Sequence, residues 1–185
     1  MPDSSTPYSV VWFKRDLRIE DHEALARAVE NGPVLCLYVI EPSIWQAPDA
    51  STQHYHFLLE CLRDLHRALR VKGGPLHVKC GEAVEVLARL HAAQPFTAIY
   101  SHEETGNDLT YARDRQVKAW CQRQGVGWHE YRQFGVVRRL KHRDLWKDAW
   151  EAHMAAPQHH WEHASFVSMP WPPTKAPSAA ALGLG

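Results

Sequence analysis

Short apolar runs alternate with longer amphipathic stretches along most of this chain. Each run is rich in β-branched or aromatic residues and is not broken by polar alternation, which is typical of strands covered on both faces. The longer stretches carry apolar residues at helical spacing, with charged residues opposite. The pattern predicts five strands, at Ser9–Phe13, Val34–Ile40, Leu76–Cys80, Ala98–Ser101 and Gly127–Tyr131.

The amphipathic stretches predict four helices between these strands, at Glu20–Glu30, Ser51–Val71, Glu82–His91 and Asn107–Gln124. Asn107 is a suitable N-cap for the last of them. Regular alternation of strands and helices indicates an α/β fold, a Rossmann-like five-stranded parallel sheet with helices on both faces. We expect the strand order 3-2-1-4-5, which puts the topological switch point between the first and fourth strands.

The pattern weakens after about Val137. One more short helix is predicted at Lys141–His153, and from Pro157 onward prolines, alanines and histidines follow with little periodicity. We therefore divide the chain into a flexible amino terminus (1–8), an α/β domain (9–153) and a linker or tail (154–185). The final Ala-Leu-Gly-Leu-Gly resembles an interrupted linker, so we expect a fragment of a longer protein.

Composition narrows the class of protein. With 185 residues and 45% apolar residues, the chain is long enough for one domain with a real core. Lys plus Arg and Asp plus Glu balance at 21 each, which argues against a free-standing nucleic-acid binder. There is no run long enough to span a membrane and no signal-peptide pattern, so a cytoplasmic location is the default expectation.

The four cysteines, Cys36, Cys61, Cys80 and Cys121, lie far apart and form no Cys-x-x-Cys pair. Cys36 and Cys80 fall in predicted strands. Buried free thiols are therefore expected rather than disulfides or zinc ligands.

Charged residues gather directly after the first strand, where Lys14–Glu20 holds five charged residues out of seven. In open α/β proteins this end of a strand is where ligands bind. For Phe13 and Lys14, contact with a ligand and a structural role are equally good interpretations. For Asp16, Arg18 and Asp21 we favour structural roles at the corner.

Two further loops follow strands at the same predicted edge. After the fourth strand, His102, Glu103 and Glu104 could accept hydrogen bonds from ring N–H groups of a heterocyclic ligand. For Asp108 we favour the alternative interpretation, in which its negative charge offsets the dipole at the amino-terminal end of the following helix. After the second strand, Tyr38 to Pro42 is followed by Trp45, whose ring could stack on a planar ligand or cap the sheet edge.

Two familiar phosphate-binding patterns are missing from the sequence. Neither Gly-x-Gly-x-x-Gly nor Gly-x-x-x-x-Gly-Lys-Ser/Thr is present, which argues against ordinary dinucleotide or triphosphate binding. The basic run Arg132–Lys147 is interpreted as a solvated surface or a face toward another domain. The tail histidines lack the pattern of a specific metal site.

The decapeptide Trp-Phe-Lys-Arg-Asp-Leu-Arg-Ile-Glu-Asp at 12–21 closely resembles the opening of the DNA photolyase/cryptochrome family. The resemblance covers roughly Tyr8 to His153. It includes Tyr38–Pro42, Gly73–Cys80 and the Arg-Asp-x-x-Val pattern within Tyr111–Val117. Where many members have Asn-Pro, this chain has His22-Glu23, which we interpret as a difference on an exposed early turn.

The resemblance is to the amino-terminal α/β domain of that family, which in many members carries an antenna chromophore of folate, deazaflavin or lumazine type. It implies that FAD, catalysis and contact with damaged DNA belong to a helical domain absent from this chain. The parent protein would repair pyrimidine dimers with light or sense light, and this chain alone is not expected to be active.

The alternative is a stand-alone Rossmann-like regulatory or protein-binding module without chromophore. By analogy the antenna would lie near Phe13, Lys14, Tyr38, Ile40, Trp45, His102, Glu103 and Glu104.

Overall fold

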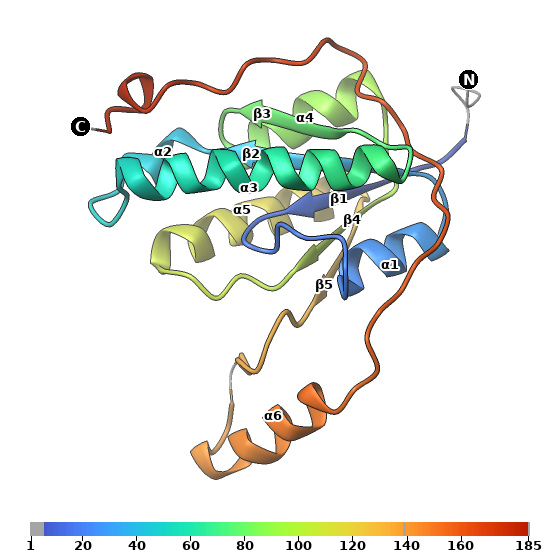
Figure 1. Ribbon diagram of the computed structural model, residues 1–185, viewed down its shortest axis with the longest axis vertical. Coiled ribbons are helices and arrows are strands. Elements are labelled where there is room, and N and C mark those ends of the chain that lie inside the picture. Colours follow the sequence, from blue (N-terminus) through green and yellow to red (C-terminus); the bar gives the residue numbers. More distant parts are fainter. Residues whose placement is uncertain (1–5, 139, 185) are drawn as a thin grey trace.

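The computed structural model describes residues 6–138 and 140–184 and contains one five-stranded sheet. All strand pairs are parallel, and the order is β3-β2-β1-β4-β5 (Figure 1). The predicted fold and strand order are confirmed, and β4 runs one residue further than expected. The strands are β1 Ser9–Phe13, β2 Val34–Ile40, β3 Leu76–Cys80, β4 Ala98–His102 and β5 Gly127–Tyr131.

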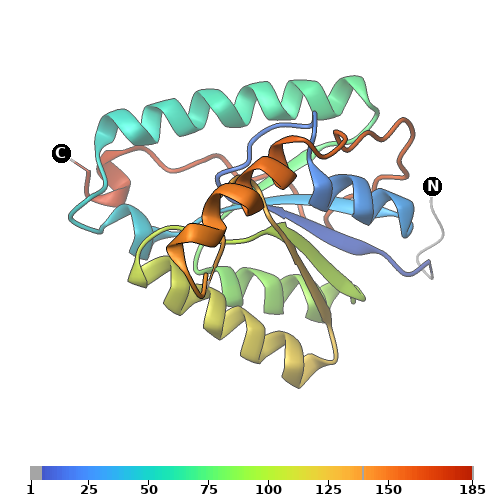
Figure 2. The same ribbon diagram turned by 90° about the horizontal axis from the view of Figure 1, so that it is seen from below.

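Helices cover both faces of the sheet (Figure 2). On one face lie α1 (Glu23–Glu30) and α3 (Thr52–Val71), and on the other lie α4 (Ala83–Ala93) and α5 (Asp108–Gln124). Alternate residues of β1 enter the two cores, Val11 and Phe13 on the α1–α3 side, Val10 and Trp12 on the other. The three central strands β1, β2 and β4 are buried along their whole length and show no polar alternation, whereas the edge strands β3 and β5 are only partly buried and carry polar residues.

Capping residues set the helix bounds. Asn107 caps α5 as predicted, its side-chain oxygen accepting a hydrogen bond from the Thr110 N–H at 3.2 Å. Gly125 ends α5 in the left-handed conformation, with φ of +68°, which glycine adopts without strain. The predicted start of the first helix at Glu20 is wrong by three residues. The chain turns at Asp21, with φ of +46°, and His22 is the N-cap of α1.

Two shorter helices lie outside the layers. The four-residue α2, Pro42–Trp45, was not predicted, since it is too short to show periodicity. The helix expected at Lys141–His153 is found as a 3₁₀ turn, Arg143–Leu145, followed by α6, Trp146–Met154. Figure 1 shows α6 projecting away from the sheet. The 3₁₀ turn and α6 together expose large apolar side chains at Leu145, Trp146, Trp150 and Met154.

The segment after α6 has little regular structure, as predicted, yet it packs against the domain along much of its length (Figure 1). Val167, Met169 and Leu182 are buried. Val34 donates from its N–H to the Ser165 carbonyl at 2.8 Å and accepts from the Val167 N–H at 2.8 Å, so the segment pairs with β2.

The same segment then follows β3, the edge strand. The Met169 N–H donates to His77 Nε2 at 3.3 Å, and Lys79 Nζ donates to the Pro172 carbonyl at 3.0 Å. Covering an edge strand in this way blocks pairing with other chains. Its role as a linker in a longer protein remains a prediction. The amino terminus predicted to be flexible lies mostly outside the described residues, although Tyr8 is buried.

The contact between Gly74 and Phe166 allows a test of this packing. A Cβ atom added at Gly74 would lie 2.3 Å from the Phe166 ring. We expect Gly74→Ala to lower the free energy of unfolding by about 1–3 kcal/mol, as for other overpacked sites. Urea unfolding measures the loss. In the double variant Gly74→Ala/Phe166→Ala the space is restored, so the double variant should be no less stable than Phe166→Ala alone. Additive losses would contradict the contact.

All four cysteines are free thiols. Cys36 and Cys121 are buried, but the expectation that Cys80 is buried is wrong, because it ends the edge strand β3 and is exposed. Among the described residues, no helix is both long enough and apolar enough to cross a bilayer.

Candidate functional site

A cavity of about 660 Å³ opens at the carboxyl ends of β1 and β2 and extends to the loop between β4 and α5. Its walls are completed by α2, by the first half of α3 and by the first turns of α5. The connections that leave β1 and β4 diverge at this edge, which creates a crevice between them. The hollow therefore lies at the switch point expected from the strand order.

The structure brings together most of the residues predicted to contact a ligand, but not all of them. Ile40 lies in the core on the α1–α3 side, and His102 turns toward Asp16. Glu103 lines a second, smaller hollow beside Arg15. Ligand contact remains a prediction for all eight. The five that line the cavity are Phe13, Lys14, Tyr38, Trp45 and Glu104.

Arg113 joins carboxylates from three parts of the fold. Its Nη1 lies 2.6 Å from Glu41 Oε1, just after β2, and its Nη2 lies 2.7 Å from Glu104 Oε2, just after β4. Its Nε lies 2.8 Å from Oδ1 of Asp114, the next residue on α5. The guanidinium also lies over the Trp12 ring, 4.8 Å from the centroid. The planar fork of arginine is suited to such multiple pairing, whereas lysine would supply a single point charge.

Sequence reasoning named Glu41 and Arg113 only as parts of motifs and missed them as site residues. A signal was present in α5. Its buried positions recur every three or four residues, at Thr110, Asp114, Val117 and Trp120, so Asp114 lies on the helix face that meets the sheet and Arg113 lies next to it. Charged residues at such a position need partners, and the ends of the strands supply them.

Electrostatics keeps the Glu104 carboxylate ionised. Burial raises the pKa of Glu104, but Lys14, Arg113 and Arg15 outweigh that effect and lower the pKa overall. Its Oε1 also accepts hydrogen bonds from the N–H groups of Thr105 and Gly106, at 2.9 and 2.8 Å. Burial raises the pKa of Glu41, and the opposing effect of Arg113 does not cancel it.

Lys14 contributes a second buried cation to this group. Its Nζ lies 3.3 Å from Asp114 Oδ2 and 5.0 Å from the centroid of the Trp12 ring. Arg138, from the basic run predicted to be a solvated surface or a face toward another domain, is only partly exposed. It donates to the Glu104 carbonyl and pairs with Glu130 at 3.1 Å. The charged side of the cavity is therefore a connected network rather than a set of free charges.

The opposite side of the cavity is aromatic. The Trp45 ring packs edge-on against Tyr55 with centroids 4.9 Å apart, and Phe57 leaves 69% of its surface exposed. Arg15 stands at the rim with 61% of its side chain exposed and its Nε 3.7 Å from Glu104 Oε1. An aromatic wall facing fixed charges suits a planar, polar heterocycle.

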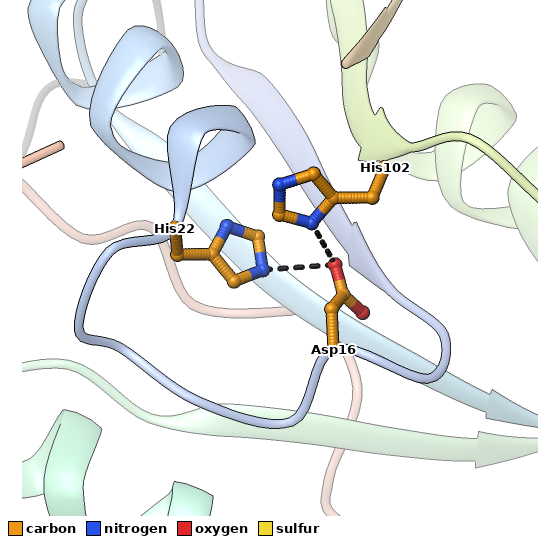
Figure 3. A group of neighbouring side chains, drawn as sticks. All are labelled: Asp16, His22 and His102. Atoms are coloured by element: carbon orange, nitrogen blue, oxygen red, sulfur yellow. Dashed lines mark hydrogen bonds and ion pairs between the residues drawn. The ribbon is translucent and has the colours of Figure 1, made fainter. Parts of the chain in front are cut away.

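Asp16, in the loop that follows β1, is buried between two histidines (Figure 3). Its Oδ2 lies 2.6 Å from His102 Nδ1 and 2.9 Å from His22 Nε2, and its Oδ1 accepts from the Lys14 N–H at 2.7 Å. The expectation that His22 lies on an exposed turn is wrong, because its side chain is fully buried. The single sequence could not reveal the contact between Asp16 and His102, since the two residues are 86 positions apart and meet only when β4 lies beside β1.

The surroundings shift both ionisable groups. Burial would raise the pKa of Asp16, but the hydrogen bonds and charges of His102 and His22 lower it well below its ordinary value. Burial lowers the pKa of His22 by more than Asp16 raises it. Asp16 is therefore a carboxylate, and His22 is neutral at neutral pH.

Comparison with known sequences finds similarity to DNA photolyases and cryptochromes along most of the α/β domain. The family model described as DNA photolyase matches residues 9–140. The chain is 36% identical over 120 residues to cryptochrome DASH of Gloeobacter violaceus, covering 61% of this chain and 24% of that protein. It is 43% identical over 72 residues to deoxyribodipyrimidine photo-lyase of Salmonella typhimurium, covering 38% of this chain and 15% of that protein.

Solved structures share the fold. A cryptochrome of Synechocystis superposes with a TM-score of 0.77 at 19% identity, over 93% of this chain and 40% of that one. A class III photolyase of Agrobacterium tumefaciens gives 0.70 at 22% identity, over 93% and 37%. The chain thus spans about a quarter of the cryptochrome DASH and about two fifths of the solved chains.

The matched residues 9–140 include all five strands and the strand ends that form the cavity. Because the family model covers β1 through β5, the chain belongs to the DNA photolyase family and corresponds to its amino-terminal α/β domain.

Proposed function

We propose that this domain binds a light-harvesting chromophore in the cavity at the ends of β1, β2 and β4. The cavity itself is the observation that carries the proposal. Its volume of about 660 Å³ falls within the usual range for small-molecule sites, about 300–1,000 Å³. The photolyase of Sulfolobus tokodaii, similar in fold with a TM-score of 0.68, was solved with two FAD molecules and a novel light-harvesting cofactor is inferred for it.

The residues present fit a folate, deazaflavin or lumazine. Trp45 would stack on the ring system, and the aromatic surface would exclude water from it. Tyr38 and Glu104 border the same space and would orient polar ring substituents, while Arg15 at the rim would meet an anionic tail. The bound chromophore would supply light absorption, and the protein would supply its position and surroundings.

The redox chemistry of the whole protein would belong to a second, helical domain that binds FAD. The apolar surface formed by Leu145, Trp146, Trp150 and Met154 would face that domain. Within it the Trp146 and Trp150 rings stack with centroids 6.0 Å apart, and Trp146 Nε1 donates to the Gly135 carbonyl at 3.0 Å. A large exposed apolar patch of this kind is typical of an interface. Contact with damaged DNA would arise only in the longer protein.

Chromophore uptake by the purified chain tests the proposal. The absorption spectrum is recorded from the near-ultraviolet to the blue, alone and after addition of methenyltetrahydrofolate, a 5-deazaflavin and a lumazine, followed by gel filtration. A band that co-elutes with the protein for one of them is expected. Failure to retain any of the three would contradict antenna binding and favour a protein-binding module that uses the α6 surface.

Replacement of Trp45 tests the position of the site. We expect Trp45→Ala to weaken binding of the retained chromophore about tenfold, as loss of a stacking interaction of about 1.4 kcal/mol would. Fluorescence titration measures the dissociation constant. Trp146→Ala, an exposed tryptophan on α6, is the matched control and should bind as the unchanged chain does. Equal affinity in both variants would place the chromophore elsewhere.

A further inference from the structure

Asp16, His22 and His102 come from three different elements and meet in the interior of the protein (Figure 3). Asp16 lies in the loop after β1, His22 caps α1, and His102 ends β4. Their side chains are 1%, 0% and 2% exposed. The oxygen Asp16 Oδ2 is the meeting point, close to one ring nitrogen of each histidine.

The backbone of α1 fixes the protonation of His22. The Leu25 N–H donates to His22 Nδ1 at 3.0 Å, so that nitrogen carries a lone pair. A neutral imidazole holds one proton, which must then sit on Nε2, facing Asp16 Oδ2. His102 Nδ1 lies 2.6 Å from the same oxygen and must be a donor as well. The Lys14 N–H donates to Oδ1, and His22 Nε2 lies 2.9 Å from Oδ2 in a close electrostatic contact that is not aligned as a hydrogen bond.

This pattern argues against a tetrahedral zinc site, although the three ligand-type atoms lie within 4.8 Å of one another. A histidine that binds a metal through Nε2 normally donates its other N–H to an acceptor, and here that nitrogen accepts from Leu25. The nitrogen–oxygen distances of 2.6 and 2.9 Å are also shorter than the edge of a tetrahedral zinc site, about 3.3 Å for bonds of about 2 Å. The group is held by the hydrogen bonds of His102 and of the Lys14 N–H to Asp16 and by the 2.9 Å contact of His22.

Asp16, His22 and His102 hold the loop after β1, which forms one wall of the cavity. Lys14, Arg15, Leu17 and Arg18 all line it, and Asp16 lies in the middle of that run. Within the run, the Arg18 side chain donates to two neighbouring loop carbonyls, those of Glu20 and Asp21. The Asp16 carboxylate ties this loop to α1 and to β4, beside the ion pairs of Lys14 with Asp114 and of Arg15 with Glu104.

We propose that Asp16, His22 and His102 form a positioning triad that sets the shape of the cavity wall and thereby the affinity for the chromophore. His22 and His102 lie outside the cavity lining and act through Asp16 and the loop. The inference rests on the proposed function for its effect on binding, whereas the ordering of the loop is a property of the chain without ligand.

His22→Asn separates the two tasks of His22. Asparagine is a good N-cap, so α1 keeps its first hydrogen bond, but the contact with Asp16 Oδ2 is lost. We expect hydrogen exchange at the amides of residues 15–18 to rise about tenfold while exchange in α1 stays unchanged. The affinity for the retained chromophore should fall by a similar factor. His160→Asn, an exposed histidine in the tail, is the control and should change neither quantity.

A second measurement keeps the test independent of the variant's folding. The ring ¹⁵N shifts of His22 in the unchanged chain should show the neutral Nε2–H form at pH 7. A protonated Nδ1, or unchanged exchange at residues 15–18 in His22→Asn, would overturn the triad. If the unchanged chain binds none of the three probes, the proposed function fails, while accelerated loop exchange would still support the triad.

Discussion

Arg113→Met should lower the free energy of unfolding by about 3–5 kcal/mol, the loss typical of breaking one side of a buried ion pair. Glu41 and Glu104 are 2% and 3% exposed at their side chains and would lose their shared cation. Asp114 would keep Lys14 at 3.3 Å. Urea unfolding at pH 7 measures the loss, and the deficit should shrink as the pH falls, because protonation removes the uncompensated charge.

Arg115→Met is the matched control, because Arg115 is exposed on the same helix two residues further on. An exposed substitution of this kind changes stability by about 0.5 kcal/mol or less. The loss of unfolding free energy for Arg113→Lys should fall between these two values, because lysine keeps the positive charge but lacks the planar set of donors of the guanidinium. A loss for Arg113→Met no larger than for Arg115→Met would show that the carboxylates are not held by Arg113.

Stability should decline with falling pH from about 6.5 downward because of His22. Its pKa is lowered in the folded protein from an ordinary value of 6.5, so below that value the unfolded chain binds a proton that the folded chain does not. The loss from this group is about 1.4 kcal/mol per pH unit until the folded pKa is reached. Asp16, with a pKa lowered from 3.8, adds a further loss only below that pH.

Comparison with His22→Asn isolates the contribution of this histidine. Asparagine at position 22 cannot titrate. The unfolding free energy of the variant should therefore depend less steeply on pH between 6.5 and 5, and the difference in slope should correspond to at most one bound proton. A residual slope is expected, since burial also lowers the pKa of His77. Thermal or urea unfolding across this pH range measures both slopes. Parallel curves for the two proteins would mean that His22 is not kept neutral by the fold.

Local pattern was sufficient to predict the layers of this protein. Continuous apolar runs such as Val34–Ile40 can be satisfied only by strands covered on both faces, and the stretches between them are amphipathic. The strand order 3-2-1-4-5 was the natural expectation for this alternation with helices on both faces, and the sheet has it. The weak points were elements without periodicity, namely α2 and the segment 155–184, whose packing depends on partners far away in the chain.

The candidate site was predictable in position and less so in membership. The ends of β1, β2 and β4 had to meet at one edge, so Phe13, Lys14, Tyr38, Trp45 and Glu104 do line one cavity. Partner choice could not be inferred, because a charged side chain reveals its need for a counter-charge but not which one it finds. Thus the sequence pattern included Arg113 as a motif residue but did not predict the carboxylates with which it pairs.

The sequence by itself determined the family, the parallel sheet and the edge at which a ligand would bind, because these depend on residue order and local periodicity. Only the tertiary structure decided that His22 is buried, that Asp16 binds His102 across 86 positions, and that the tail covers the β3 edge. Those contacts join residues far apart in the chain. Burial and pairing of a polar side chain are set by what the fold places beside it, which no local pattern encodes.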